Sequence, residues 1–241
     1  MKYKCKILCY LVTFVAWTNV LIVLQTRKFK LDIYKTTFQN WNKLASAYQD
    51  KFMEMDLYND TYTIFCRLIK KTHPNVFEIG CGPGNITKNL LTQRPDFKIE
   101  AIDMAPNMIK LAKLNNPAAD FKTMDCREID TITKKFDGII CGFCMPYLSK
   151  EDCAKVIKDC SSLLLSEGIF YFSVIEDSYN KSGYETSSDG EHRMFIYYHE
   201  ETYLKKGLKE NNFELLELLK KNYSKADGTS ATHSIFIAKK K

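Results

Sequence analysis

The sequence has no net charge beyond its first 35 residues. Residues 1–35 carry seven basic groups and one acidic group, which accounts for the whole net charge of +6. The remaining 206 residues hold 28 basic and 28 acidic groups. A nucleic-acid footprint on a folded domain needs an excess of Lys and Arg. The composition therefore argues against a nucleic-acid partner.

The chain also lacks the cysteine pattern of a metal site or a disulfide framework. Its nine cysteines are an odd number, scattered through predicted strands and helices. Cys141 and Cys144 form the only C-x-x-C pair, which supplies two of the four ligands that a structural zinc needs. We expect reduced, buried thiols in a domain that faces the cytosol, and no metal site.

Internal repeats and low-complexity linkers are absent as well. The length of 241 residues and the 45% hydrophobic content allow one domain with a sizeable core and a short appendage. We assign residues 36–241 to this domain and residues 1–35 to a hydrophobic N-terminal segment with basic flanks.

One long apolar run is present, at residues 7–24. It is 18 residues without a charge, which just reaches the span of a hydrocarbon core. No small-residue cleavage site follows it, which argues against a secretory signal peptide. The run predicts an uncleaved membrane anchor. The alternative is a hydrophobic extension that anchors nothing and leaves the protein in the cytoplasm.

Residues 76–85, Val-Phe-Glu-Ile-Gly-Cys-Gly-Pro-Gly-Asn, predict a buried strand that ends in a glycine-rich turn. Ile86, Leu90 and Leu91 follow at helical spacing. Strand, glycine turn and helix are typical of a nucleotide site at the carboxyl edge of a parallel sheet, where a turn without Cβ atoms approaches the ligand closely.

Two residues of this stretch argue against NAD as the ligand. Asn85 stands where the dinucleotide fingerprint has a third glycine or an alanine. Glu78 lies in the strand just before the first glycine. A carboxylate that points into the crevice suits a positively charged ligand group and would repel a pyrophosphate.

The pattern Glu78-x-Gly80-x-Gly82-x-Gly84, with Asp103 downstream, resembles motif I and its acidic partner in class I S-adenosylmethionine-dependent methyltransferases. The resemblance extends over about residues 38–240. It implies an α/β, Rossmann-like sheet of seven strands, mostly parallel, with helices on both faces and an antiparallel last strand. It also implies S-adenosyl-L-methionine as the cofactor and methyl transfer as the reaction.

Asp103 ends the predicted strand 97–103, 23 positions after Gly80. Rossmann-type folds place a carboxylate near this separation against ribose hydroxyls, and an ionised carboxylate accepts two such donors. An acidic helix cap is the alternative. Met104 and Met108 are then either apolar neighbours of the cofactor or core residues.

The resemblance assigns further residues to the cofactor. Asp125 and Cys126, at the end of the predicted third strand, match the positions that contact adenine, although Asp125 also suits a turn. Tyr48, in a predicted cap helix, lies over the cofactor in relatives or belongs to a core-facing stripe. The whole expected cofactor set is Tyr48, Glu78, Gly80, Cys81, Gly82, Asn85, Asp103, Met104, Met108, Asp125, Cys126 and Gly142.

The acceptor side is less defined. The Asp/Asn-Pro-Pro-Tyr signature of many amine- and base-methylating enzymes is absent, and only Pro146-Tyr147 remains. This departure favours a small-molecule acceptor over a nucleic-acid base or a glutamine. Tyr147 and His199 are candidates for a general base. A single histidine beside aromatics is also typical of a packing residue.

Residues 36–73 are predicted as cap helices, and residues 176–198 as a substrate lid or a solvated loop. S-adenosylmethionine is expected in the cytosol, so the domain of an anchored protein should face the cytoplasm. A non-catalytic cofactor-binding protein and a protein- or RNA-methylating enzyme are the alternative functions. The sequence identifies neither the acceptor nor an oligomeric state.

Overall fold

The computed structural model describes residues 33–186, 191–225 and 227–241. The anchor predicted at residues 7–24 lies outside these ranges and stays a prediction. Within the described ranges, no helix has the length and apolar character needed to cross a membrane.

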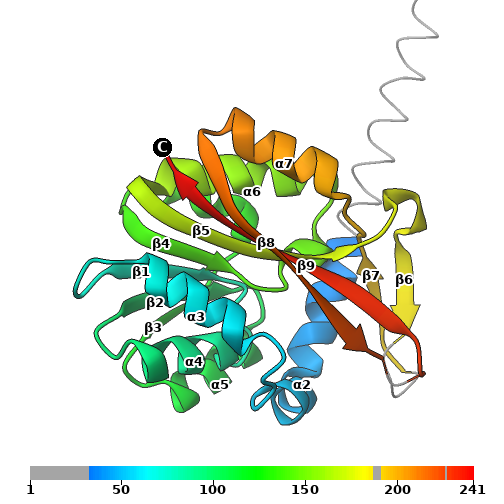
Figure 1. Ribbon diagram of the computed structural model, residues 1–241. Coiled ribbons are helices and arrows are strands. Elements are labelled where there is room, and N and C mark those ends of the chain that lie inside the picture. The colour runs from blue at the N-terminus through cyan, green and yellow to red at the C-terminus, as the bar shows by residue number, and fades with distance from the viewer. Residues whose placement is uncertain (1–32, 187–190, 226) are drawn as a thin grey trace, which may run out of the picture.

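A seven-stranded sheet in the order β3-β2-β1-β4-β5-β9-β8 runs through the middle of the domain (Figure 1). Its strands are β1 (Asn75–Ile79), β2 (Lys98–Asp103), β3 (Asp120–Thr123), β4 (Phe136–Cys141), β5 (Leu164–Glu176), β8 (Phe213–Ser224) and β9 (Ser230–Lys240). Strands β1 to β5 pair in parallel, whereas β9 pairs antiparallel with both β5 and β8. The prediction of a seven-stranded sheet with an antiparallel last strand is confirmed.

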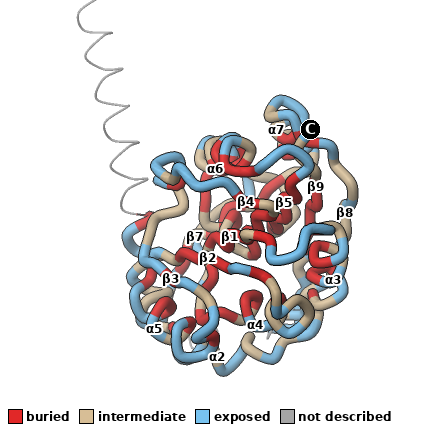
Figure 2. The backbone as a smooth tube through the Cα atoms, turned by 90° about the vertical axis from the view of Figure 1, so that its left-hand side faces the viewer, coloured by how far each residue is buried: buried red, intermediate tan, exposed pale blue. Residues whose placement is uncertain are grey.

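Both faces of the sheet are buried. Alternate residues of β1 enter different cores: Val76 packs with Phe65 and Leu90, whereas Phe77 packs with Val156 and other residues on the opposite face. This division follows from the two-residue period of a strand. The helices of the first face are α3 (Asn59–Leu68), α4 (Asn85–Gln93) and α5 (Pro106–Asn115), and those of the second are α6 (Lys150–Leu163) and α7 (Glu201–Glu210). Figure 2 shows the buried backbone along the inner strands.

The strand order reverses between β1 and β4. The chain builds outward from β1 to β3 and then returns to place β4 on the other side of β1. Connections leave in opposite directions at this point, so a crevice opens beyond the carboxyl ends of β1 and β4. The glycine-rich turn lies at this crevice.

Two additional pieces border this edge of the sheet. Residues 33–43 are helical and are followed by α2 (Ala45–Phe52), within the region predicted as cap helices. Residues 176–198 contain a two-stranded antiparallel ribbon of β6 (Gly183–Thr186) and β7 (Arg193–Ile196). Asn40 Nδ2 donates to the Arg193 carbonyl at 2.8 Å and so links the first helix to the ribbon.

Candidate active site

The glycine turn is fastened to the end of β2. The N–H groups of Gly80 and Cys81 both donate to the Ile102 carbonyl, at 2.8 and 3.0 Å. Gly80 has a φ of +72°, and a Cβ placed on it would lie 2.8 Å from the Cβ of Cys144. A side chain at this position is therefore excluded both by backbone conformation and by space. The predicted strand, turn and helix are all present.

A cavity of about 150 Å³, here called the turn cavity, lies over this turn. It brings together most of the residues that the sequence assigned to the cofactor. Those that line it are Tyr48, Gly80, Gly82, Asp103, Met104, Met108, Asp125, Cys126 and Gly142. Tyr147, a candidate base, lines it as well.

Glu78, Cys81 and Asn85 do not line the turn cavity. Cys81 is 1% exposed and packs in the core beneath α4, so its side chain does not line the turn cavity, and its role in cofactor binding stays a prediction. Asn85 begins α4 and faces a second, larger cavity. These three residues lie in or beside the turn in the sequence, but their side chains do not line the turn cavity.

Glu78 is fully buried behind the turn instead of pointing into the crevice. Its Oε2 accepts from the Thr87 hydroxyl, while Oε1 has no hydrogen-bond partner. Burial raises the pKa of Glu78 to about 8, against the opposing effect of the Thr87 hydrogen bond. The carboxyl therefore holds its proton more tightly than an exposed glutamate does. It lies behind the turn and does not line the turn cavity, and its contact with the cofactor stays a prediction.

Asp103 does line the turn cavity, and both of its oxygens are used. Oδ2 accepts from the Gly82 N–H at 2.9 Å, and Oδ1 accepts from the Ala105 N–H at 2.8 Å. Burial raises the pKa of Asp103, and these two backbone bonds oppose the rise. The cap residue of α5 is Ala105, so Asp103 is not the cap of that helix. Each carboxylate oxygen can still accept a second hydrogen bond.

Asp125 serves as a turn residue, in agreement with the alternative reading. It is the cap of the short 3₁₀ helix η1 (Cys126–Thr131) and accepts from the Arg127 N–H at 2.9 Å. Burial alone would raise the pKa of Asp125, but the hydrogen bonds from Arg127 outweigh it and hold that pKa below its usual value. Its contact with adenine stays a prediction.

Aromatic side chains form the wall between the turn cavity and a second cavity of about 890 Å³, here called the aromatic cavity. The Tyr48 ring lies 5.3 Å from that of Trp41, which lies 5.5 Å from that of Tyr147. Trp41, Tyr48, Tyr147 and Phe143 line both cavities. The two cavities are therefore neighbours, and these four side chains lie at their shared border.

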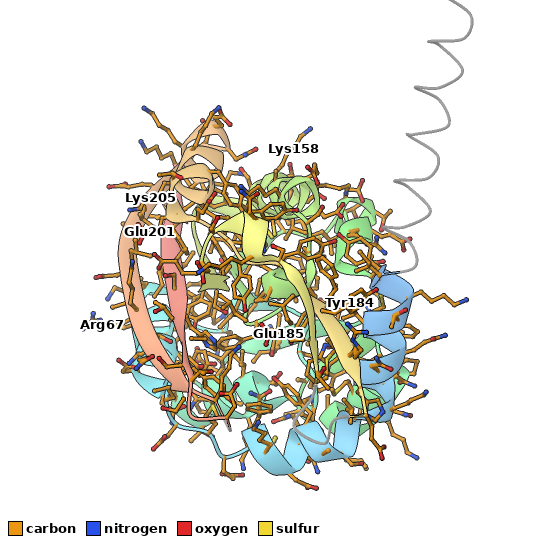
Figure 3. All side chains as sticks on the ribbon, turned by 90° about the vertical axis from the view of Figure 1, so that its right-hand side faces the viewer. Arg67, Lys158, Tyr184, Glu185, Glu201 and Lys205 are labelled. Atoms are coloured by element: carbon orange, nitrogen blue, oxygen red, sulfur yellow. The ribbon has the colours of Figure 1, made fainter. Side chains whose placement is uncertain are left out.

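Nine of the residues that line the aromatic cavity are aromatic: Trp41, Tyr48, Phe52, Tyr58, Tyr62, Phe143, Tyr147, Tyr198 and Tyr223. The β6–β7 ribbon contributes Glu185 to the lining, and Glu185 binds Tyr198 and, at 3.0 Å, Lys225. Figure 3 views the molecule from the side of this ribbon, where neighbouring Tyr184 and Glu185 are labelled.

His199 lies away from both cavities. It is completely buried, with Nδ1 bonded to the Tyr203 hydroxyl and Nε2 3.0 Å from the Met145 carbonyl oxygen. Burial lowers the pKa of His199 to about 4. The geometry fits the packing alternative and does not support His199 as a general base. For Tyr147, burial raises the pKa far above neutrality, and its role as a base stays a prediction.

The sequence reasoning missed His233, which lines the aromatic cavity near the start of β9. A signal was available, because the start of an antiparallel last strand lies at the carboxyl edge of the parallel strands. It also missed Trp41 and Phe143, which lie between the two cavities.

Comparison with known proteins agrees with this geometry. Residues 76–168 match the family model described as "Methyltransferase domain". A putative methyltransferase of Invertebrate iridescent virus 6 is 38% identical over 77 residues, which are 32% of this chain and 29% of that protein. A malonyl-[acyl-carrier protein] O-methyltransferase of Acetivibrio thermocellus is 32% identical over 108 residues, 44% of this chain and 37% of that protein. The chain thus spans about a third of the length of these relatives.

Solved structures share the fold across most of the chain. The 1,6-didemethyltoxoflavin-N1-methyltransferase of Burkholderia thailandensis superposes with a TM-score of 0.65 at 16% identity, over 86% of this chain and 88% of that one. A methyltransferase from Methanosarcina mazei gives a TM-score of 0.62 at 16% identity, over 72% of this chain and 95% of that one. Residues 76–168 thus match a methyltransferase domain, and the chain as a whole shares the fold of solved methyltransferase structures.

Proposed function

We propose that this chain transfers the methyl group of S-adenosylmethionine to a small-molecule acceptor, with the cofactor in the turn cavity and the acceptor in the aromatic cavity. The observation that carries this proposal is that the two cavities share four lining residues near the carboxyl ends of β1 and β4. Trp41, Tyr48, Phe143 and Tyr147 border both. A methyl group can pass only between molecules that meet, and these rings frame such a meeting point.

The residues around the turn cavity fit part of the cofactor, since a volume of about 150 Å³ is too small for the whole molecule. Gly80 leaves space that a Cβ would fill, so the backbone can approach a ligand closely. Asp103 keeps accepting capacity for two ribose hydroxyls. The Oε1 of Glu78 is buried without a partner just behind the turn, and such an atom costs free energy until a donor or a positive charge compensates it. The methionine part of the cofactor carries both a donor group and positive charge.

When bound, S-adenosylmethionine supplies a sulfonium methyl group that is already activated for attack. The remaining task of the protein is to align the acceptor and to exclude water. The aromatic rings exclude water, and the β6–β7 ribbon covers one side of the aromatic cavity through Glu185, Thr186 and Ile196. This coverage supports the lid role proposed for residues 176–198.

The size of the aromatic cavity also supports a small acceptor over a macromolecule. A volume of about 890 Å³ lies within the range of drug-sized ligand sites. The domain carries no excess of positive charge for RNA.

Calorimetry on the full chain tests the cofactor assignment. We expect S-adenosylhomocysteine to bind and NAD not to bind. Incubation with radiolabelled S-adenosylmethionine and pooled small metabolites then tests transfer, by counting label in small products. Binding of NAD alone would contradict the assignment. Label found only in protein or RNA would contradict the small-molecule acceptor.

A further inference from the structure

His233 reaches the aromatic cavity because β9 runs against the other strands. Its partner residues are Ile175, at the end of β5, and Lys221 on β8. The alternate residues Ile235 and Ile237 belong to the core on the α3 side, so His233 lies on that face too. It is 6% exposed. The start of β9 thus places the His233 imidazole at the edge of the sheet where the two cavities lie.

Three aromatic rings hold the His233 imidazole. It stacks on Tyr223 at 5.2 Å and 12° and on Tyr58 at 5.9 Å and 12°, and it contacts Phe143 at 5.3 Å. Nδ1 lies 2.7 Å from the Tyr58 hydroxyl oxygen. No described residue hydrogen-bonds Nε2, and Nε2 is not sealed from solvent. One ring nitrogen is therefore fixed by the protein, and the other is available to a molecule in the cavity.

Phe143 connects this imidazole to the cofactor side. It follows β4 with a φ of +58°, a conformation that costs a non-glycine residue about 1–2 kcal/mol. Its N–H donates to the Ser173 hydroxyl at 2.8 Å, and its ring packs 4.6 Å from that of Tyr58. Strain of this kind is concentrated at functional sites. The strained residue is the one that lines both cavities and contacts His233.

The surroundings of His233 favour a neutral imidazole, a form that can accept a hydrogen bond at Nε2 but holds a transferred proton weakly. Burial lowers the pKa of His233 to about 4, and the positive charge of Lys225 adds to this effect. Of the groups that face it, Lys221 is paired with Asp60 at 2.6 Å and Lys225 with Glu185 at 3.0 Å. Tyr58, the cap residue of α3, and Tyr223, on β8, also contact the imidazole.

The described cavity lining holds two carboxylates, Glu185 and Asp227. Glu185 binds Lys225 and Tyr198, and Oδ1 of Asp227 accepts from the Thr229 N–H and hydroxyl. Nine of the lining residues are aromatic. A neutral hydroxyl on a flat apolar ring fits these walls, since aromatic faces bury planar rings and the imidazole can accept its proton.

We propose that His233 is a catalytic residue of this chain, and that its Nε2 accepts the proton of an acceptor whose nucleophile is a hydroxyl on an aromatic ring. This inference rests on the proposed methyl transfer. The acceptor oxygen forms a bond to the methyl carbon while the carbon–sulfur bond breaks and its electron pair stays on sulfur. The hydroxyl proton passes to Nε2, and this step requires the tautomer in which Nδ1–H donates to the Tyr58 oxygen.

A fluorescent probe tests the assignment by binding alone. The full chain, saturated with S-adenosylhomocysteine, is titrated with 2-naphthol and with 2-methoxynaphthalene, which has the same rings without the hydroxyl proton. We expect 2-naphthol to bind at least tenfold more tightly. His233→Asn keeps a group near Tyr58 but has no atom at the Nε2 position, so it should abolish this preference.

The matched control is His73→Asn. His73 is exposed, lines neither of the two cavities and has a φ of +50°, which asparagine tolerates. This variant should keep the full preference for 2-naphthol. The inference is overturned if the wild-type protein shows no preference, or if His233→Asn retains it.

Nitrogen NMR of the wild-type imidazole needs no variant and covers the case in which His233→Asn does not fold. We expect the Nδ1–H tautomer in the complex with S-adenosylhomocysteine, and a shift of the Nε2 resonance on addition of 2-naphthol. An Nε2–H tautomer in that complex would overturn the inference. Failure of S-adenosylhomocysteine to bind would instead contradict the proposed function, so the two failures are distinguishable.

Discussion

The Gly82 N–H donates to Oδ2 of Asp103 at 2.9 Å, which ties the middle of the glycine turn to the end of β2. Asp103 therefore has two tasks, since the same carboxylate orients the turn and faces the turn cavity. The separation of Gly80 and Asp103 in the sequence indicated only that Asp103 faces the ligand. A substitution at Asp103 should therefore affect ligand binding more than it affects packing of the core.

Asp103→Ala should weaken binding of S-adenosylhomocysteine by about 1.5–3 kcal/mol, because ribose hydroxyls lose a charged acceptor. The turn also loses one backbone bond, so the melting temperature should fall slightly while the protein still folds. Calorimetry on the folded variant measures the affinity. Asp120→Ala, at an exposed position at the start of β3, is the control and should bind like the wild type. Unchanged affinity in Asp103→Ala would contradict the ribose role.

Glu78 should make the stability of the ligand-free protein depend on pH. Its pKa is raised from 4.5 to about 8 by burial, so the folded state binds the proton more tightly than the unfolded state. This contribution to the free energy of unfolding is fully present below pH 4.5 and is lost as the pH rises toward 8. Urea unfolding of Glu78→Gln should therefore show a weaker fall in stability between these pH values.

Glu128→Gln changes an exposed carboxyl and is the control for this titration. It should follow the wild-type pH dependence. If Glu78→Gln followed the wild-type curve too, the carboxyl would have to be ionised in the folded protein at neutral pH.

Gly80→Ala should destabilise the protein and impair cofactor binding together. The backbone conformation costs about 1–2 kcal/mol, and the overlap with the Cβ of Cys144 adds about 1–3 kcal/mol. Gly228→Ala separates the two effects, because Gly228 has a φ of +82° with nothing within 4 Å of its added Cβ. Denaturant unfolding should show the larger loss for Gly80→Ala. Equal losses would mean that Cys144 moves aside freely.

Tyr48 should contribute through its ring and not through its hydroxyl. The ring lines both cavities and contacts Trp41, and the hydroxyl has no hydrogen bond to a described residue. Tyr48→Ala should weaken binding of S-adenosylhomocysteine by roughly 1–3 kcal/mol through lost apolar contact. Tyr48→Phe should bind within twofold of the wild type, as measured by calorimetry. A large loss in Tyr48→Phe would assign the contact to the hydroxyl.

The features that the sequence determined are local. Residues 76–103 hold the strand, the glycine turn, the helix and the acidic end of the next strand in one continuous stretch, so spacing alone places Gly80 near Asp103. The buried strands were readable because a strand covered on both faces is apolar along its length. The antiparallel last strand came from the family resemblance, and the observed pairing of β5 with β9 confirms it.

The side chains of Glu78, Cys81 and His199 lie outside both cavities for one shared reason. Their positions in the sequence are near the motif or near aromatics, but the direction of a side chain depends on which face of its element is covered. Glu78 and Cys81 point into the body of the protein, and His199 packs against Tyr203 and the Met145 carbonyl. The position of a residue in the sequence predicted the strand or turn that holds it, but not the direction of its side chain.

Only the tertiary structure decided the acceptor side. Tyr58 and His233 are 175 positions apart and meet because α3 covers one face of the sheet and β9 runs back along it. Their contact depends on strand order, strand direction and helix packing at the same time, and none of these is encoded by a local spacing. The sequence by itself therefore determined where the cofactor motif lies, whereas chain folding over long range assembled the walls that the acceptor would meet.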